Sequence, residues 1–358
     1  MRHFSFLIWA FWAVCLAFQG CQKDPNADIA DIHYRTDFRR TDSLLYAGAK
    51  AFHDDSTMAM KKVYEQFLQP ERDFWWEFSG EEANVFRLQI PISKVTPTFQ
   101  DSILMLWSSD FLRNPDGYKL LDTIQQVFPN QQIFEESLSP LFKRVRKYLP
   151  NAQIPKIRTH VSGYDYKMPQ ADVTIMTPKY ISVGLHYLLG ENCHYYPSQI
   201  PKYISRRLDK KYLAVLVGNE LVNRVVPEPE TKETHLLAKT IHLGIRQYVL
   251  DKLLPNEPDS MKLYYTEKQM YWADYYEERI YKEIVPQLYS TDFLTYRKYL
   301  EEKPYTSDLS LESAPRLSQY FGWKVVASYM ENHPKVTLEQ LCIMQNYEQI
   351  FKESKYKP

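Results

Sequence analysis

The chain has 358 residues, and its 44 basic and 44 acidic side chains leave no formal net charge. This length can bury a large core, in one domain or in two closely packed ones. The even charge balance, without any basic run, argues against nucleic acid as a partner.

The N-terminus has the pattern of a lipoprotein signal peptide, predicted over residues 1–20. A short positive start precedes a mainly apolar run over residues 4–18, which is too short for a comfortable membrane span. A small residue then precedes Cys21, as in the bacterial lipobox. We therefore expect Cys21 to carry acyl chains such as palmitate, with residues 21–30 as a tether. The alternative is a plain signal peptide or membrane anchor.

Residues 31–150 are predicted to be helical, because apolar side chains recur at i, i+3 and i+4 spacing. Three aromatic residues in a row, Phe74–Trp76, could form a carbohydrate platform, but packing in the core is the favoured interpretation. The predicted core positions are Val63, Phe67, Leu68, Phe74, Trp75, Phe78, Ile103, Leu104, Leu106, Trp107, Phe134, Leu138, Leu141, Phe142 and Val145.

Residues 151–358 form a second part, which we expect to be continuous with the first. It begins with short segments rich in β-branched residues at 157–163, 172–177 and 180–185. They predict a sheet of three or four strands beside the helix that follows. His186 and His194 lie in a loop-like stretch, where a role as metal ligands is a minor alternative.

The stretch from Leu208 to Val226 predicts a central helix. Asp209 can cap its start, and Pro227 ends it because proline cannot continue the hydrogen bonding. The residues between them are apolar almost all round, which is typical of a helix buried in the middle of a domain.

This helix nevertheless carries polar residues in the order N-E-L-V-N, at Asn219, Glu220 and Asn223. Zinc peptidases of the zincin type have H-E-x-x-H in this frame, where two His bind the metal and Glu is the base. An amide oxygen is a weak zinc ligand, so the helix has the frame of an active-site helix without its metal ligands. The alternative is an interior helix whose two Asn bond to neighbouring backbone.

The next predicted helix, over residues 231–254, lacks the third ligand as well. In such peptidases a Glu directly before a Gly completes the zinc site, and the matching residue here is Leu243, before Gly244. His235 and His242 are seven residues apart and so share a helical face, but His242 is one position out of register for this site. We therefore expect no metal and no cofactor.

Two further cysteines, Cys193 and Cys342, remain in the body of the chain. One disulfide is possible in an oxidising compartment, but two buried free thiols are the favoured interpretation.

Several blocks of sequence point to a known family. The longest are residues 265–280, 322–330 and 354–358, supported by 154–157, 162–163, 181–190 and 253–255. Over nearly the whole mature chain, these blocks resemble the gliding-motility lipoprotein GldB family of Bacteroidetes. The family is similar in turn to zinc-dependent peptidases with an intact H-E-x-x-H. The resemblance implies an envelope lipoprotein needed for gliding, with linked effects on chitin use.

The predicted fold is therefore α+β and mostly α, a zincin-like helical domain with a small sheet. The leading functional hypothesis is a pseudoenzyme: a non-catalytic scaffold, anchored through Cys21 to an envelope membrane, with the outer membrane favoured. It would hold or position proteins of the gliding or associated secretion machinery. The alternatives are a metal-dependent hydrolase with Glu220 as base, and a module that binds a peptide or glycan in the same cleft.

Overall fold

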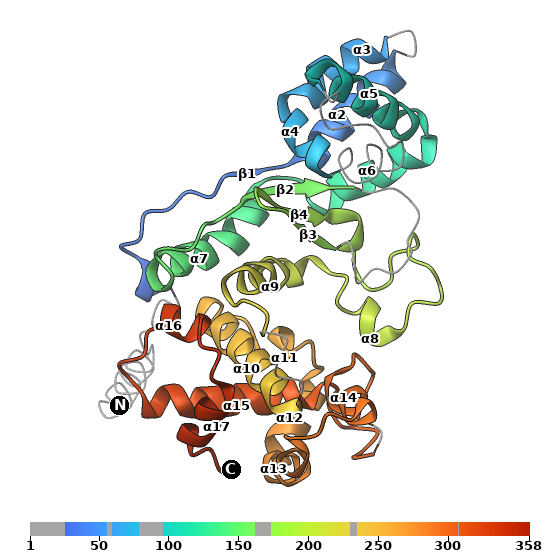
Figure 1. Ribbon diagram of the computed structural model, residues 1–358. Helices are drawn as coiled ribbons and strands as arrows, with labels where there is room; N and C mark the ends of the chain where they lie inside the picture. Colours follow the sequence, from blue (N-terminus) through green and yellow to red (C-terminus); the bar gives the residue numbers. More distant parts are fainter. Residues whose placement is uncertain (1–25, 56–58, 79–95, 162–172, 230–234, 307) are drawn as a thin grey trace, which may run out of the picture.

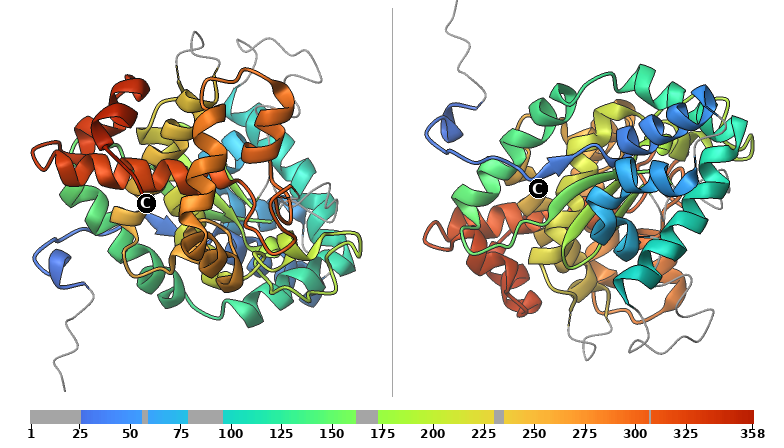
Figure 2. Two further views of the ribbon diagram at one scale, coloured as in Figure 1. Left: turned by 90° about the horizontal axis from the view of Figure 1, so that it is seen from below. Right: turned by 90° about the horizontal axis from the view of Figure 1, so that it is seen from above.

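The computed structural model describes residues 26–55, 59–78, 96–161, 173–229, 235–306 and 308–358. A small sheet lies between a cap of N-terminal helices and a larger group of helices formed by the rest of the chain (Figures 1 and 2). The longer helices are α2 (Thr41–Asp54), α5 (Pro97–Arg113), α6 (Pro115–Val127), α7 (Gln132–Tyr148), α9 (Leu213–Val225), α10 (Leu236–Leu253), α12 (Glu267–Tyr275), α13 (Glu277–Ile284), α14 (Phe293–Leu300), α15 (Leu317–Asn332) and α17 (Tyr347–Ser354). The shorter ones are α3 (Met60–Val63), α4 (Arg72–Trp75), α8 (Lys202–Ser205), α11 (Asp259–Lys262) and α16 (Leu338–Cys342).

The sheet has four strands among the described residues, in the order β1-β2-β4-β3. They are β1 (Phe38–Arg39), β2 (Lys156–His160), β3 (Thr174–Met176) and β4 (Tyr180–Gly184). The first three strands in that order run parallel, and β3 joins β4 antiparallel as an edge strand. The predicted small sheet is confirmed, although its strands are shorter than expected. The two residues of β1 were expected to be helical, and so short a strand has no periodicity that a sequence pattern could reveal.

Buried polar contacts join the N-terminal helices to the sheet. Arg40 pairs with the buried Asp42 at 2.6 Å, between Nη2 and Oδ2. The backbone N–H of Asp42 donates to Oγ1 of Thr159 on β2 at 3.2 Å, and the Thr41 hydroxyl donates to the Thr159 carbonyl. Because a buried charge is stable only when it is paired and hydrogen-bonded, these bonds fix α2 over β2.

Most of the predicted core positions before Pro150 are buried. Phe74 and Trp75 are about 1% exposed, so this aromatic pair belongs to the core and not to a surface platform. The prediction that Leu106 is buried is wrong. Its side chain is 66% exposed, because α5 turns this side away from its neighbours. The Trp107 side chain lies outside the described residues. The fully buried positions are Val63, Leu68, Phe74, Trp75, Leu104, Phe134, Leu138, Leu141, Phe142 and Val145.

Helix α9 lies between the sheet and α10, and α10 packs in turn against α15 (Figure 1). The predicted helix over 231–254 is α10, which begins only at Leu236. His235 is its N-cap residue and precedes the helix, so it does not share a helical face with His242 as expected. Residues 230–234 lie outside the described part.

Both described cysteines, Cys193 and Cys342, are free. Cys342 is buried as expected, whereas Cys193 is only partly buried. None of the helices in the described residues is long and apolar enough to cross a membrane.

Candidate functional site

The central helix forms where the sequence predicts it. The Asp209 side chain accepts a hydrogen bond from the Lys211 N–H and starts a short 3-10 turn, Lys210–Tyr212, that leads into α9. The helix ends at Val225, with Val226 as C-cap directly before Pro227. It is not buried all round, however. Leu216, Asn219 and Glu220 are partly exposed and Asn223 is exposed, so one face is open.

This open face forms one wall of a cavity of about 340 Å³. The cavity walls come from α9, from the start of β3, from the segment around α8, and from two loops of the C-terminal helices. The lining residues are Val173, Thr174, Ile204, Arg207, Leu208, Leu216, Asn219, Glu220, Tyr264 and Glu302. A cavity of this size, with apolar walls and a few polar groups, is the usual form of a ligand-binding site.

Asn219 is fixed in the wall of this cavity. Its side-chain nitrogen donates to the Val215 carbonyl at 3.0 Å and to the phenol oxygen of Tyr264 at 3.2 Å. The hydrogen bond to neighbouring backbone, which the interior-helix alternative expects of Asn219, is therefore confirmed. The amide joins α9 to the loop after α11, and so helps to set the shape of the cavity.

Glu220 lies next to Asn219 and faces the edge strand. The Thr174 hydroxyl donates to its Oε1 at 2.7 Å. Burial raises the pKa of the Glu220 carboxyl above its usual range, while hydrogen bonds from Thr174 and Asn223 and the charge of Arg246 act in the opposite direction. A carboxyl with a raised pKa in a cavity can bind a ligand or take part in proton transfer, so its pKa alone decides neither role.

The remaining positions of the peptidase frame do not complete a metal site. Asn223 is exposed, contrary to the expectation of a buried amide, because it lies on the open side of α9, while Leu221 and Val222 beside it are buried. Leu243 on α10 does not line the cavity. Asn219 thus holds an amide that is bonded within the protein, and Asn223 holds an amide exposed to solvent. Leu243 has no donor atom at all, so these three positions do not fit zinc. No cluster of three His, Cys, Asp or Glu side chains suited to a metal occurs in the described ranges.

The histidines considered as minor alternatives lie apart. His186 is fully buried, and its ring lies 5.8 Å from that of His160 between the centroids. Burial lowers the pKa of His186 to about 3. His194 is exposed on the loop that follows. His242 is also buried, its Nε2 is 3.6 Å from Oε2 of Glu228, and burial lowers its pKa to about 4.

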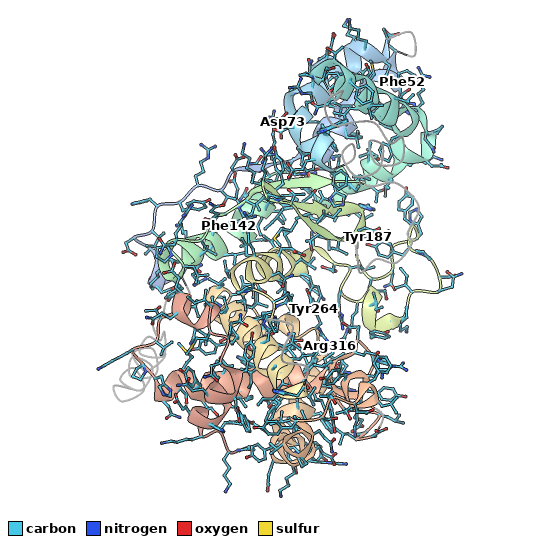
Figure 3. All side chains as sticks on the ribbon, viewed as in Figure 1. Phe52, Asp73, Phe142, Tyr187, Tyr264 and Arg316 are labelled. Atoms are coloured by element: carbon cyan, nitrogen blue, oxygen red, sulfur yellow. The ribbon has the colours of Figure 1, made fainter. Side chains whose placement is uncertain are left out.

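Three further residues of the site were missed by sequence reasoning. Arg207, Tyr264 and Glu302 meet at the end of the cavity, although long stretches of chain separate them. Tyr264 and Arg316, which lie close together in Figure 3, have φ of 56° and 50°. A left-handed conformation costs a non-glycine residue about 1–3 kcal/mol and is common at ligand-binding sites. The only local signal in the sequence is the Arg206-Arg207 pair just before the central helix.

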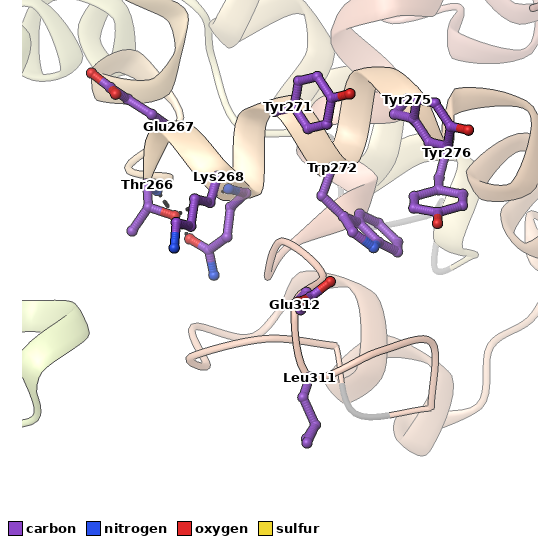
Figure 4. Close-up of a pocket in the computed structure, with 10 residues that line it drawn as sticks. Thr266, Glu267, Lys268, Tyr271, Trp272, Tyr275, Tyr276, Leu311 and Glu312 are labelled. Atoms are coloured by element: carbon purple, nitrogen blue, oxygen red, sulfur yellow. Dashed lines mark hydrogen bonds between the residues drawn. The ribbon is translucent and has the colours of Figure 1, made fainter.

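A second and larger cavity, of about 840 Å³, lies along α12 (Figure 4). Tyr271 and Tyr275 are about 70% exposed there, with rings stacked 6.1 Å apart between centroids. Trp272 projects from α12 toward Leu311 and Glu312. Exposed aromatic groups of this kind can mark an interaction surface. The cleft on α9 is nevertheless the stronger candidate, because it combines strained backbone, buried charge and the polar face of the central helix.

The fold and the cleft define an α+β protein with a helix-lined pocket of ligand-binding type. The family described as gliding motility protein GldB matches residues 22–358, so the chain belongs to the GldB family of gliding-motility lipoproteins. This confirms the resemblance noted in the sequence and indicates an association with the cell envelope. No curated protein and no solved structure matches the chain.

Proposed function

We propose that this protein is a non-catalytic, lipid-anchored scaffold of the gliding machinery, and that it holds an envelope partner protein in the cleft on α9. Family membership supports the envelope setting. The single observation that carries the scaffold function is the cleft itself: a cavity of about 340 Å³ lies against Asn219 and Glu220 of α9. The metal-ligand positions of the peptidase frame hold Asn219 and Asn223 on this helix and Leu243 on α10.

The likeness to zincins would explain this arrangement. Such peptidases place a small sheet beside the active-site helix, and here the Thr174 hydroxyl of β3 bonds to Glu220 of α9. A cleft that has lost its metal ligands can still bind an extended polypeptide. The second candidate, a metal-dependent hydrolase, is favoured by the raised pKa of Glu220, since a general base is most effective when its pKa lies near the working pH.

Complementation of a deletion strain distinguishes these functions. We expect Glu220→Ala to restore gliding, because a scaffold needs no base. Glu278→Ala is the matched control, since Glu278 is an exposed glutamate on α13. Leu216→Trp, which fills the cleft, should fail to restore gliding although it folds and reaches the membrane.

Two results would contradict the proposal. If Glu220→Ala folds and reaches the membrane normally but does not restore gliding, Glu220 performs chemistry. Full rescue by Leu216→Trp would show that the cleft is not the binding surface.

Zinc content gives an independent measurement: protein exposed to zinc should retain far less than one equivalent. Stoichiometric zinc that is lost in Asn219→Ala would favour the hydrolase.

A further inference from the structure

Three arginines gather around Tyr264 at one end of the α9 cleft. Nη2 of Arg206 and Nη2 of Arg207 donate to the Tyr264 carbonyl at 2.6 and 3.1 Å. The guanidinium carbons of Arg207 and Arg316 lie 4.8 and 5.6 Å from the centroid of the Tyr264 ring. Arg316 also donates to the Leu263 carbonyl at 2.6 Å. Tyr264 thus fixes three cationic groups in a small volume.

Only one carboxylate forms ion pairs with these arginines among the described residues. Nη2 of Arg207 lies 2.7 Å from Oε1 of Glu302, and Nε of Arg316 lies 3.6 Å from its Oε2. Glu191 acts on Arg206 only at longer range, and Glu220 faces the same cavity. Burial raises the pKa of the Glu220 carboxyl, and no ion pair joins Glu220 to these arginines in the described part of the chain.

The positive charge at this end therefore exceeds the negative charge. Burial lowers the pKa of Arg206 and of Arg316, and repulsion from Arg207 lowers both further. The Nε atoms of all three arginines are buried and make no hydrogen bond to any residue that the structure describes. Buried cations are stable when an anion compensates them. The left-handed backbone of Tyr264 and Arg316 shows that the chain accepts strain to hold this arrangement.

We propose that the Arg207 end of the cleft is a carboxylate-binding subsite, which holds a C-terminal carboxylate or an acidic side chain of a polypeptide lying along α9. This rests on the proposed function, since it names what the cleft recognises in its partner. The planar fork of a guanidinium matches the two oxygens of a carboxylate.

The rest of the cleft fits the polypeptide part of such a ligand. Ile204, Leu208 and Leu216 give it apolar walls beside Arg207. Thr174 is the first residue of the edge strand β3. One side of β3 pairs with β4, and its other side pairs with no strand in the described part of the chain. An extended segment can bind along such an edge while its carboxylate reaches the arginines.

Binding of three labelled peptides to the full-length protein in detergent tests the proposal. All share one apolar sequence: the first has a free C-terminus, the second is amidated and neutral, and the third is amidated with one internal Glu. On the wild type we expect the first or the third to bind at least about tenfold more tightly than the second. Which of them binds better distinguishes a C-terminal from a side-chain carboxylate. This comparison needs no variant, so it holds even if a substitution impairs folding.

Substitution of the arginine gives the second measurement. Arg207→Gln should remove most of the advantage of the acidic peptides, and Arg207→Lys should retain part of it because the charge stays while the fork is lost. Arg297→Gln is the matched control, since Arg297 lies on α14 outside the cleft and pairs with Glu301. It should bind like the wild type.

Equal affinity for all three peptides, including no binding by any of them at millimolar concentration, would overturn the subsite. Unchanged preference in a folded Arg207→Gln variant would do so as well. Neither result affects the Leu216→Trp complementation, which tests the cleft itself. Conversely, failure of Glu220→Ala to restore gliding would contradict the scaffold function while the carboxylate preference stayed measurable in the purified protein.

Discussion

Gly244 of α10 and Gly322 of α15 lie against each other where the two helices cross. A Cβ added at Gly244 would lie 2.2 Å from the Gly322 carbonyl, and one added at Gly322 would lie 2.0 Å from the Thr240 carbonyl oxygen. In zinc peptidases the third metal ligand, a Glu, directly precedes a Gly, and Gly244 is the glycine at that position here. The contact between the two helices explains why a glycine is needed at this position, without any role in metal binding.

The crossing makes Gly244→Ala destabilising, although Ala is normally favoured over Gly in a helix by about 1 kcal/mol. Backbone atoms cannot rotate away, so α15 must shift, and we expect a loss of about 1–3 kcal/mol or more by urea unfolding. Gly218→Ala is the control. Its Cβ would meet the ends of flexible side chains, those of Leu250 and Leu254 at 2.9 and 3.0 Å and that of Leu141 at 3.8 Å, so its loss of stability should be smaller. A higher melting temperature for Gly244→Ala would contradict the close contact.

The two asparagines of α9 should differ in their effect on stability. Asn219→Leu removes the hydrogen bonds to the Val215 carbonyl and the Tyr264 hydroxyl, which should cost about 1–3 kcal/mol. Asn223→Leu should cost less, about 0.5 kcal/mol, because Asn223 is exposed and water can replace its hydrogen bond to Glu220. Chemical denaturation of both variants measures the difference. Equal losses would mean that α9 is covered on both sides.

The sequence predicts the parts of this fold that depend on local patterns. The cap at Asp209, the stop at Pro227 and the β-branched segments after Pro150 all lie where short-range rules place them. Patterns of spacing do not show which side of a helix other elements will cover. For that reason Leu106 and Asn223 were expected to be buried and are exposed.

The cleft depends on contacts that no local pattern contains. Arg207 bonds to Glu302, 95 residues away, and to Tyr264, 57 residues away. Asn219 and Glu220 were found because their spacing on one helix matches a known frame. The arginine cluster was not predicted, because the arginines come together only when α8, α11, α14 and α15 pack against one another.

Acid should destabilise the protein partly through His242. Its ring faces Glu228 and Arg246, and burial lowers its pKa from 6.5 in the unfolded chain to about 4. Between these values the unfolded chain binds a proton that the folded one does not, so stability falls as pH drops from about 6.5 to 4. The loss is at most about 3 kcal/mol.

We therefore expect His242→Phe to lose less stability than the wild type over this pH range, as measured by thermal unfolding at several pH values. His194→Phe is the control, since it makes the same substitution at an exposed histidine. The idea fails if His242→Phe and the wild type have the same pH dependence.

Cys21 is the expected site of lipidation. The family match begins at residue 22, directly after this cysteine, and the apolar run that precedes it has the length of a signal peptide. Two or more acyl chains anchor a protein stably, because each buried CH₂ contributes about 0.8 kcal/mol.

We expect the wild type to incorporate a palmitate analogue and to enter the detergent phase. Cys21→Ala should lose the label and keep the higher mass of the uncleaved precursor. Cys193→Ala, which removes a partly buried thiol in the body of the protein, should behave like the wild type. Equal labelling of Cys21→Ala and the wild type would rule out this cysteine as the anchor.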